Sequence, residues 1–329
     1  MDRNYHVFQD GRLAREEGSL TVRTDDDIHR LPVENVGALY FHGQIDVNTR
    51  ALDFLSQHGI TAHLFNWNEY YAGSYVPRRA LTSGNSLVQQ AAYHLDERKR
   101  TMIARSIVAA SAAEMRRNLT YYDNRGTSLR EIIDRIDELT VGVGDTESVE
   151  ALLGIEGNVR RAYYRSFSRI LPEGFVLDRR VYNPPDNEVN SLISFGNSLL
   201  YSSILSELHN THLDPTVSYL HEPGERRFSL CLDISELFKP LLVDRLLFRL
   251  VNRSQITKED FDSGLNGCLL TGDGRRLFVR EYEETLERTV KHPTLDRHVS
   301  YQYLLRLEGY KLHKHILGDK SYEPFSRWW

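Results

Sequence analysis

The sequence predicts an α and β multidomain protein: a β-rich N-terminal domain, residues 1–80, followed by a larger all-α C-terminal domain, residues 81–329. Three observations support this fold class. Short runs over the first 80 residues alternate apolar and polar side chains with period two. From Ser86 onward the apolar residues recur with a period near 3.6. The length of 329 residues also suits about two domains of ordinary size.

The N-terminal part has the pattern of short strands rich in β-branched and aromatic residues, bounded by glycine or polar turns. The predicted strands are Tyr5–Phe8, Ser19–Val22, Val36–Phe41 and Thr61–Phe65. One short helix is expected over residues 48–55, where the apolar spacing changes. Pro77 marks the expected end of this part, because proline interrupts regular structure.

The remainder of the chain has the periodicity of amphipathic helices. Ser128 is expected to cap the second of these helices, with Glu131 three residues later as its capping-box partner. The predicted helices cover residues 86–124, 128–139, 146–170, 189–209, 234–252, 272–289 and 297–317.

The composition excludes a disordered chain and a membrane span. A hydrophobic fraction of 40% and a charged fraction of 26% are ordinary for globular proteins. No run of about 18 apolar residues occurs, and the first residues lack the apolar centre of a signal peptide. Cys231 and Cys268 lie in apolar surroundings and are expected to be buried free thiols. We therefore expect a cytoplasmic protein with no membrane association.

Glu156 lies between two glycines within a predicted helix, in the segment Gly154-Ile155-Glu156-Gly157. Each glycine costs about 1 kcal/mol relative to alanine in a helix. One interpretation is that a ligand or a neighbouring backbone approaches the helix at Glu156. The alternative is that the glycines pack helix against helix while Glu156 is merely exposed. The local sequence leaves both interpretations open.

His221, Asp233 and Glu236 form a second group of residues suited to chemistry. A single histidine is more often structural than a ligand, and Asp233 and Glu236 could simply cap a helix start. Together with Glu156, however, the group offers two carboxylates and one imidazole. This mixture of ligands suits a hard divalent cation such as Mg²⁺ or Mn²⁺. Such an ion could polarise a phosphate and neutralise charge on a leaving oxygen.

These segments, in this order, resemble the family of CRISPR-associated integrases, the endonuclease subunits of the complex that inserts new spacers into CRISPR arrays. The resemblance covers nearly the whole chain. The matching motifs are Gly154–Gly157, Asn190–Tyr201, His221 with Pro223 and Arg226, Leu232–Pro240, Gly73–Arg78, and Tyr310–His315 through Pro324-Phe325 and Trp328-Trp329.

The resemblance implies that Glu156, His221 and Glu236 bind Mg²⁺ or Mn²⁺, with Asp233 as a supporting acidic residue of the catalytic set. Some members have aspartate where Glu236 stands, which leaves the ligand role intact. The implied fold is an N-terminal β-domain, used for dimerisation, joined to a helical catalytic domain. The implied partners are short double-stranded DNA fragments, the CRISPR repeat, a second copy of the chain, and a small ferredoxin-like protein of endoribonuclease type. With that protein the family forms a heterohexamer.

The implied reaction is a transesterification in which the 3′-hydroxyl of a short DNA fragment attacks a phosphodiester at the edge of the repeat. The net charge of −5 does not exclude DNA, since local basic patches determine the binding field. For each basic residue alone, a solvated helix face is an equally good explanation. The candidate phosphate contacts are Arg161, Arg165, Arg169, Arg245, Arg249, Arg306, Lys311 and Lys314.

Two other functions remain open at this point. The chain could be a metal-dependent DNA-repair nuclease without integrase activity, which a joined-strand product would exclude. It could also be a non-catalytic DNA-binding scaffold whose carboxylates are helix caps, which binding of a divalent ion would exclude. A metal hydrolase of small molecules ranks lower, because no P-loop or GxGxxG segment is present.

Overall fold

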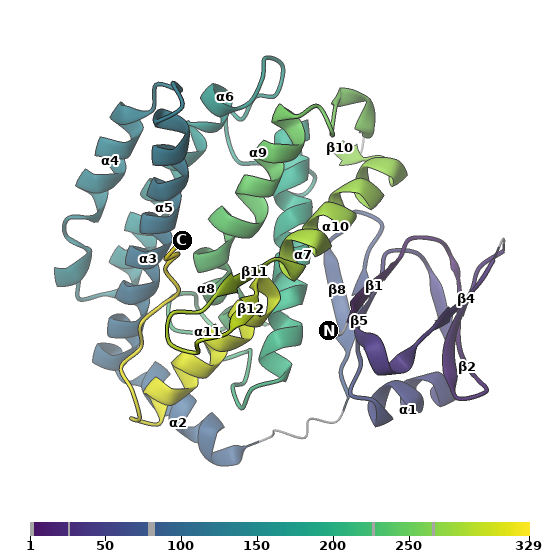
Figure 1. Cartoon of the computed structure of the whole chain (residues 1–329). Helices are drawn as coiled ribbons and strands as arrows, with labels where there is room; N and C mark the ends of the chain where they lie inside the picture. The colour runs from purple at the N-terminus through teal and green to yellow at the C-terminus, as the bar shows by residue number, and fades with distance from the viewer. Residues whose placement is uncertain (1–2, 26, 78–82, 226–227, 265–266) are drawn as a thin grey trace. The chain divides into compact units, whose positions relative to one another are not determined.

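The structure is a computed structural model that describes residues 3–25, 27–77, 83–225, 228–264 and 267–329 (Figure 1). Its packing groups Met1–Thr82 with Gly272–Glu283 as one unit, and Ser83–Thr271 with Glu284–Trp329 as a second. The domain boundary expected at residue 80 lies outside the described residues. The two predicted domains are each continuous in sequence, whereas in the structure Gly272–Glu283 packs with the N-terminal unit.

The first unit contains two four-stranded sheets. In one sheet the strand order is β1-β5-β7-β8: β1, β5 and β7 are parallel, and β8 is antiparallel to β7. In the other the order is β4-β3-β2-β6, with β2 and β6 parallel and the remaining pairs antiparallel. The strands are β1 (Arg3–Val7), β2 (Gly11–Glu16), β3 (Ser19–Arg23), β4 (Ile28–Leu31), β5 (Val36–Phe41), β6 (Ile45–Val47), β7 (Thr61–Phe65) and β8 (Tyr71–Tyr75).

Helix α1 (Thr49–Gln57) lies in the crossover between the parallel strands β5 and β7, which cannot be joined by a tight turn. The Asn48 side chain caps it by accepting a hydrogen bond from Ala51 N at 2.9 Å. Leu13 and Leu20 from one sheet, Leu39 from the other and Leu55 from α1 share one hydrophobic core. The first unit is therefore a two-sheet domain held by a single apolar interior.

A chain of hydrogen bonds holds the first turns of α10 (Gly272–Glu287) within this unit. His6 Nε2 lies 3.0 Å from Glu283 Oε1, and His6 Nδ1 lies 3.0 Å from His42 Nε2. His42 Nδ1 in turn contacts Glu69 Oε2 at 2.5 Å, and Arg275 of α10 also pairs with Glu69. Burial lowers the pKa of His42. These hydrogen bonds and the Arg275–Glu69 ion pair explain why Gly272–Glu283 packs with residues far earlier in the sequence.

The second unit is mostly helical, and α7 (Glu188–His209) is its most deeply buried helix. Most α7 side chains up to Leu208 are buried, and they include polar ones such as Asn190 and Glu207 as well as apolar ones. It packs against α8, η3 and α11. The other helices are α2 (Gly84–Leu95), α3 (Glu97–Asp123), α4 (Arg130–Thr140), α5 (Val149–Tyr164), α6 (Phe167–Ile170), α8 (Ser229–Phe238), the π-helical η3 (Lys239–Asp244), α9 (Arg245–Asn252) and α11 (Tyr301–Ile316).

The predicted fold class, a β-rich N-terminal part followed by a larger helical part, is confirmed. The second part is not purely helical, because two short antiparallel hairpins interrupt it. One joins β9 (Phe261–Gly264) to β10 (Gly267–Leu270), and the other joins β11 (Thr289–Lys291) to β12 (His298–Ser300). Their strands have three or four residues each, too few for a period-two pattern to be recognised.

Several predicted helix boundaries are wrong for identifiable reasons. The single helix expected over residues 86–124 is two helices, because Asp96 ends α2 and caps α3 through Lys99 N at 3.1 Å. Ser128 does not cap α4, which begins after Leu129 without a side-chain cap. The helix expected over residues 146–170 divides into α5 and α6. The last predicted helix before the first hairpin begins at Ser229 rather than Ile234.

The prediction of two buried free cysteines is confirmed for Cys231 and Cys268. Among the described residues, no helix combines the length and apolar character needed to cross a membrane.

Candidate active site

Glu156 is presented by the middle of α5, at a point where the helix surface is open. Ser148 caps α5 by accepting from Ala151 N at 3.1 Å. A Cβ atom built on either Gly154 or Gly157 would meet no atom within 4 Å. The interpretation that these glycines serve helix–helix packing is therefore wrong for this chain. The open surface beside Glu156 agrees with the other interpretation, the approach of a ligand.

Glu156 and Glu236 converge on one guanidinium group. Arg160 Nε lies 3.1 Å from Glu156 Oε1, and Arg160 Nη2 contacts Glu236 Oε2. Lys239 Nζ lies 2.5 Å from the other Glu236 oxygen, Oε1. The side chains are 5% exposed for Glu236 and 17% for Glu156, so water screens these charges weakly. A buried carboxylate, Glu236, and a partly buried one, Glu156, thus share a position that a cationic group occupies.

A proline and two polar side chains fix the segment that carries Glu236. Pro240 has no N–H to donate to the carbonyl of Glu236, its partner four residues earlier in a regular helix. Ser111 Oγ of α3 donates to that carbonyl instead, at 2.9 Å. Asn118, also on α3, donates to the carbonyl of Pro240 at 2.7 Å. The chain continues as η3, so the π-helical geometry begins directly after the site.

His221 is oriented by Asp233. Asp233 is completely buried, and its Oδ1 lies 2.8 Å from His221 Nδ1. The same carboxylate accepts from the backbone N–H groups of Tyr219, Leu220 and His221 at 2.6, 3.0 and 2.9 Å. Asp233 therefore organises the preceding loop and does not cap its own helix. With Nδ1 engaged, Nε2 of the partly exposed imidazole is directed to other partners, as in carboxylate–histidine–metal arrangements.

The surroundings of the carboxylates contain further buried charges. Burial lowers the pKa of Lys239 to about 8, and the positive charge of Arg160 acts in the same direction. Burial raises the pKa of Asp244 to about 6.

Tyr163 is buried and accepts a hydrogen bond from Asn118 Nδ2 at 3.1 Å. Tyr163 is therefore a core residue.

The donor types at the site fit a hard divalent cation: two carboxylates that already share a cation position, and an imidazole with a carboxylate on its second nitrogen. Among the described residues, no three His, Cys, Asp or Glu side chains are grouped closely enough to hold a metal ion. Arg160 stands between Glu156 and Glu236, and His221 pairs with Asp233. Glu156 and Glu236 are thus connected through Arg160, and His221 is connected to Asp233. Glu236 and Asp233 both lie on α8.

An arginine-rich cleft of about 840 Å³ lies on the second unit. No Asp or Glu occurs among the described residues that line it. Arg245 and Arg249, which we predicted as DNA contacts, are part of its wall. Asn118 and Leu241 connect it to the segment that follows Glu236. In the cleft the arginines are Arg117, Arg125, Arg245, Arg249, Arg253, Arg288 and Arg327, and the aromatic residues are Tyr121, Tyr122, Phe248, Tyr301 and Trp329.

Most of these cleft arginines were absent from the sequence prediction, because four separate segments supply them and no local pattern unites them. The other predicted contacts are scattered. Arg161 and Arg165 are exposed at the end of α5, whereas Arg169 lies on α6 and bonds the carbonyl of Ser128. They therefore do not form one ridge on a single helix. The remaining candidates are Arg306, which pairs with Glu207, Lys311, which pairs with Glu308, and the exposed Lys314.

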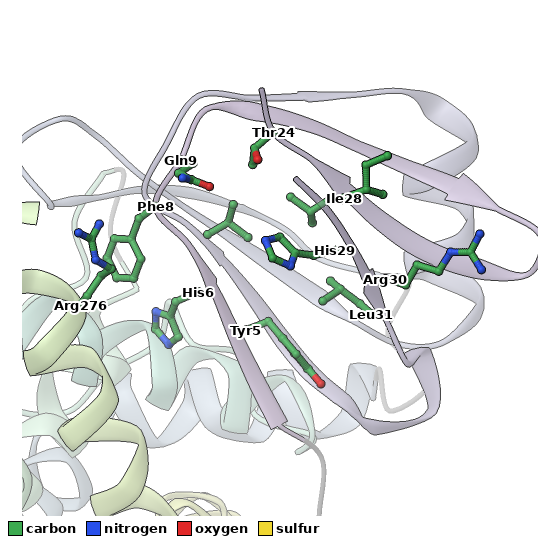
Figure 2. Close-up of a pocket in the computed structure, with 12 residues that line it drawn as sticks. Tyr5, His6, Phe8, Gln9, Thr24, Ile28, His29, Arg30, Leu31 and Arg276 are labelled. Atoms are coloured by element: carbon green, nitrogen blue, oxygen red, sulfur yellow. The ribbon is translucent and has the colours of Figure 1, made fainter. Parts of the chain in front are cut away.

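A second cavity, of about 710 Å³, lies in the first unit beside the edge strands β1 and β4 (Figure 2). Its lining is mainly apolar, with Tyr5, Phe8 and Leu31 among the side chains. Ile28, which also lines it, is 53% exposed. Two unpaired strand edges beside an apolar hollow are features of a surface that pairs with another chain.

Solved structures of low sequence identity show which fold the chain shares. The chain aligns with a casposase bound to an integration product, with a TM-score of 0.87 at 20% identity over 99% of this chain and 94% of that one. A Cas6-RT-Cas1–Cas2 complex aligns with a TM-score of 0.86 at 22% identity, over 99% of this chain and 36% of that one. At these identities the likeness shows a common fold of β-rich and helical parts.

Closer relatives define the family. A Cas1 protein from Thermotoga maritima aligns with a TM-score of 0.89 at 39% identity, covering 97% of this chain and 99% of that one. The CRISPR-associated endonuclease Cas1 of Haloferax volcanii is 47% identical over 99% of both chains. The family model for CRISPR associated protein Cas1 matches residues 5–284. The chain belongs to the Cas1 family, which confirms the resemblance found in its motifs.

Replacing Asp233 by asparagine tests its role in holding His221. The variant keeps one acceptor but places an N–H group against backbone N–H groups, so we expect Asp233→Asn to lower the free energy of unfolding by about 2 kcal/mol. Urea unfolding followed by circular dichroism measures this. Glu222→Gln, at an exposed carboxylate of the same loop, is the control and should change stability by less than about 0.5 kcal/mol. Equal stability of Asp233→Asn and wild type would show that Asp233 does not organise the loop.

Proposed function

We propose that this chain is a metal-dependent DNA endonuclease and integrase of CRISPR spacer acquisition. It would join the 3′-hydroxyl ends of short foreign DNA fragments to the CRISPR repeat by transesterification. The observation that carries the proposal is the convergence of Glu156 and Glu236 on one cation position. Glu236 lies on α8, the helix that also carries Asp233 and, through it, orients His221. The endonuclease name of the Haloferax relative and the integration product bound to the casposase support it.

In this proposal Glu156, His221 and Glu236 would hold Mg²⁺ or Mn²⁺. When bound, such an ion polarises the phosphodiester and neutralises charge on the leaving oxygen. Asp233 keeps His221 in the tautomer that leaves Nε2 free of a proton, and it fixes the ring. Ser111 and Asn118 hold the backbone that carries Glu236. The chain's own contribution is therefore largely the positioning of charged groups.

The proposed reaction exchanges one phosphodiester for another. The 3′-oxygen of the fragment forms a new bond to phosphorus while the bond from phosphorus to the old 3′-oxygen of the repeat breaks. The proton of the attacking hydroxyl leaves to solvent, and the departing oxygen gains one. No nucleotide hydrolysis is required, because the bonds formed and broken are of the same type. Water in place of the hydroxyl would give simple cleavage.

We propose that the arginine-rich cleft supplies much of the DNA affinity. The cleft arginines attract phosphates, and aromatic walls accept unstacked bases. Glu114 pairs with Arg117 and Arg327, but no carboxylate is among the described residues that line the cleft itself. The Arg125 guanidinium carbon lies 4.1 Å from the centre of the Tyr121 ring, so this cation is already held against an aromatic side chain of the cleft. Arg161, Arg165, Arg169, Lys311 and Lys314 remain candidate contacts of lower rank.

We propose that the chain acts in the cytoplasm as a homodimer that pairs through its β-rich N-terminal unit. Two such dimers would bind a dimer of a small ferredoxin-like partner of endoribonuclease type, which gives a heterohexamer. The exposed edges of β1 and β4 beside an apolar cavity are compatible with pairing. The presence of Cas2 in the Cas6-RT-Cas1–Cas2 complex supports a second CRISPR-associated partner. Light scattering measures whether the purified chain has the mass of a dimer.

A metal-dependent DNA-repair nuclease without integrase activity is the second candidate. The same carboxylates and imidazole would serve hydrolysis equally well, since only the attacking oxygen differs. A non-catalytic DNA-binding scaffold is less compatible with this geometry. Asp233 is not a cap of its own helix, and Glu236 turns toward Arg160 and Lys239.

A strand-joining assay tests the proposal. It combines a labelled short duplex, a plasmid with a CRISPR repeat, Mn²⁺ or Mg²⁺, and the ferredoxin-like partner. We expect Glu156→Gln, Glu236→Gln and His221→Ala each to lower the joining rate by about a hundredfold or more, and chelation of the metal to abolish it. DNA affinity should remain, because the cleft is unaltered. Glu150→Gln, at an exposed glutamate of the same helix α5, is the matched control and should join normally.

The products separate the candidates. Joined strands that require the metal and the three residues support the integrase. Cleaved but unjoined DNA would favour the repair nuclease. Normal joining by Glu156→Gln or Glu236→Gln would remove these carboxylates from the mechanism.

The cleft is tested by the double variant Arg125→Gln/Arg245→Gln, which removes two exposed arginines from its wall. We expect DNA affinity to fall by about tenfold and the slope of log affinity against log salt to decrease by about two. Fluorescence anisotropy at several salt concentrations measures both. Arg130→Gln/Arg135→Gln on α4 is the control, because those arginines already pair with Asp134 and Glu138. Unchanged affinity in the cleft variant, with a loss in Arg161→Gln/Arg165→Gln, would move the DNA surface to the end of α5.

A further inference from the structure

The four charged side chains in direct contact at the candidate site balance one another without a metal ion, and the buried Asp244 adds a further carboxyl group that interacts with Arg160 and Lys239. Glu156 and Glu236 contribute two negative charges, and Arg160 and Lys239 contribute two positive charges in direct contact with them. Three of the four carboxylate oxygens are engaged: Glu156 Oε1, Glu236 Oε1 and Glu236 Oε2. A divalent ion added to these four side chains would leave an excess of positive charge at a poorly screened position, which Asp244 offsets only in part.

Arg160 is the group that stands where the ion would have to bind. It is the one cationic side chain of the described residues that bridges both carboxylates. Lys239 contacts Glu236 through its other oxygen, Oε1. Its own hydrogen bonding is incomplete, because Nη1 is buried and has no acceptor among the described residues. A buried guanidinium N–H without an acceptor is unfavourable, so Arg160 is held less firmly than its two ion pairs suggest.

The Tyr164 ring offers the Arg160 side chain a second binding position. The Arg160 guanidinium carbon lies 6.0 Å from the centre of the Tyr164 ring, one turn further along α5. Tyr164 is partly exposed, and its ring face can accept a cation. The surface beside Glu156 is open at Gly157, so a phosphate could approach the displaced guanidinium.

We propose that Arg160 is an internal competitor of the divalent ion, holding Glu156 and Glu236 in place without metal and yielding to the ion when a phosphodiester arrives. The inference rests on the proposed function, since it concerns the same metal site. A DNA phosphate compensates the added charge and gives the released guanidinium new acceptors. Metal binding and DNA binding therefore strengthen each other, by the same factor in both directions.

Metal titration tests this without an activity measurement. The full chain is titrated with Mn²⁺ alone, and free Mn²⁺ is counted by electron paramagnetic resonance. We expect Arg160→Met to bind Mn²⁺ about tenfold more tightly than wild type, because the competing charge is gone. Arg135→Met is the control: this arginine lies on α4, is exposed and pairs with Glu138. Its affinity should equal that of wild type.

The charge itself is tested by Arg160→Lys, which retains one positive group beside Glu156 and should bind Mn²⁺ nearly as weakly as wild type. A short DNA duplex should increase the Mn²⁺ affinity of wild type more than that of Arg160→Met. If Arg160→Met unfolds without metal and refolds on addition of Mn²⁺, followed by circular dichroism, the proposal is also supported.

Equal Mn²⁺ affinities for wild type and Arg160→Met would overturn the competition while leaving the metal site intact. Equally tight binding by Arg160→Lys and Arg160→Met would overturn the role of charge. Absence of Mn²⁺ binding in every variant, with or without DNA, would overturn this inference together with the metal site of the proposed function.

Discussion

The buried contact of Arg160 with Glu156 and Glu236 is the interaction on which the site depends. Two carboxylates that face each other at low exposure repel unless a cation lies between them. The guanidinium provides that cation and joins α5 to α8 across the helical unit. Because a buried ion pair is costly to desolvate, its presence is a weak argument for stability and a stronger one for function.

Much of the surrounding structure serves to hold these charges in register. Pro240 interrupts the hydrogen bonding of α8, and Ser111 and Asn118 of α3 replace the missing contacts. Asp233, three residues before Glu236, gathers the loop that carries His221. One short helix therefore positions an imidazole on one side and a carboxylate on the other. A Cβ atom on either glycine beside Glu156 would meet no atom within 4 Å, so α5 is open at Gly154 and Gly157.

The sequence predicted the fold class, the family and the segments of the site because each depends on local pattern. Strands such as β5 and helices such as α7 have long, regular periodicity, and Glu156 stands out between two glycines. Contacts between distant segments were not predictable in this way. Arg160 was overlooked because an arginine four residues after a glutamate is ordinary on a helix surface. The cleft combines arginines from four segments, and the packing of Gly272–Glu283 with the first unit depends on Glu283 reaching His6.

A crystal structure of the full chain soaked with Mn²⁺, with data collected at an energy where manganese scatters anomalously, tests the central claim most directly. The account predicts an anomalous peak within bonding distance of Glu156 and Glu236, with the Arg160 guanidinium displaced from between them. An absence of anomalous density at these carboxylates at saturating Mn²⁺, with Arg160 still bridging them, would contradict it.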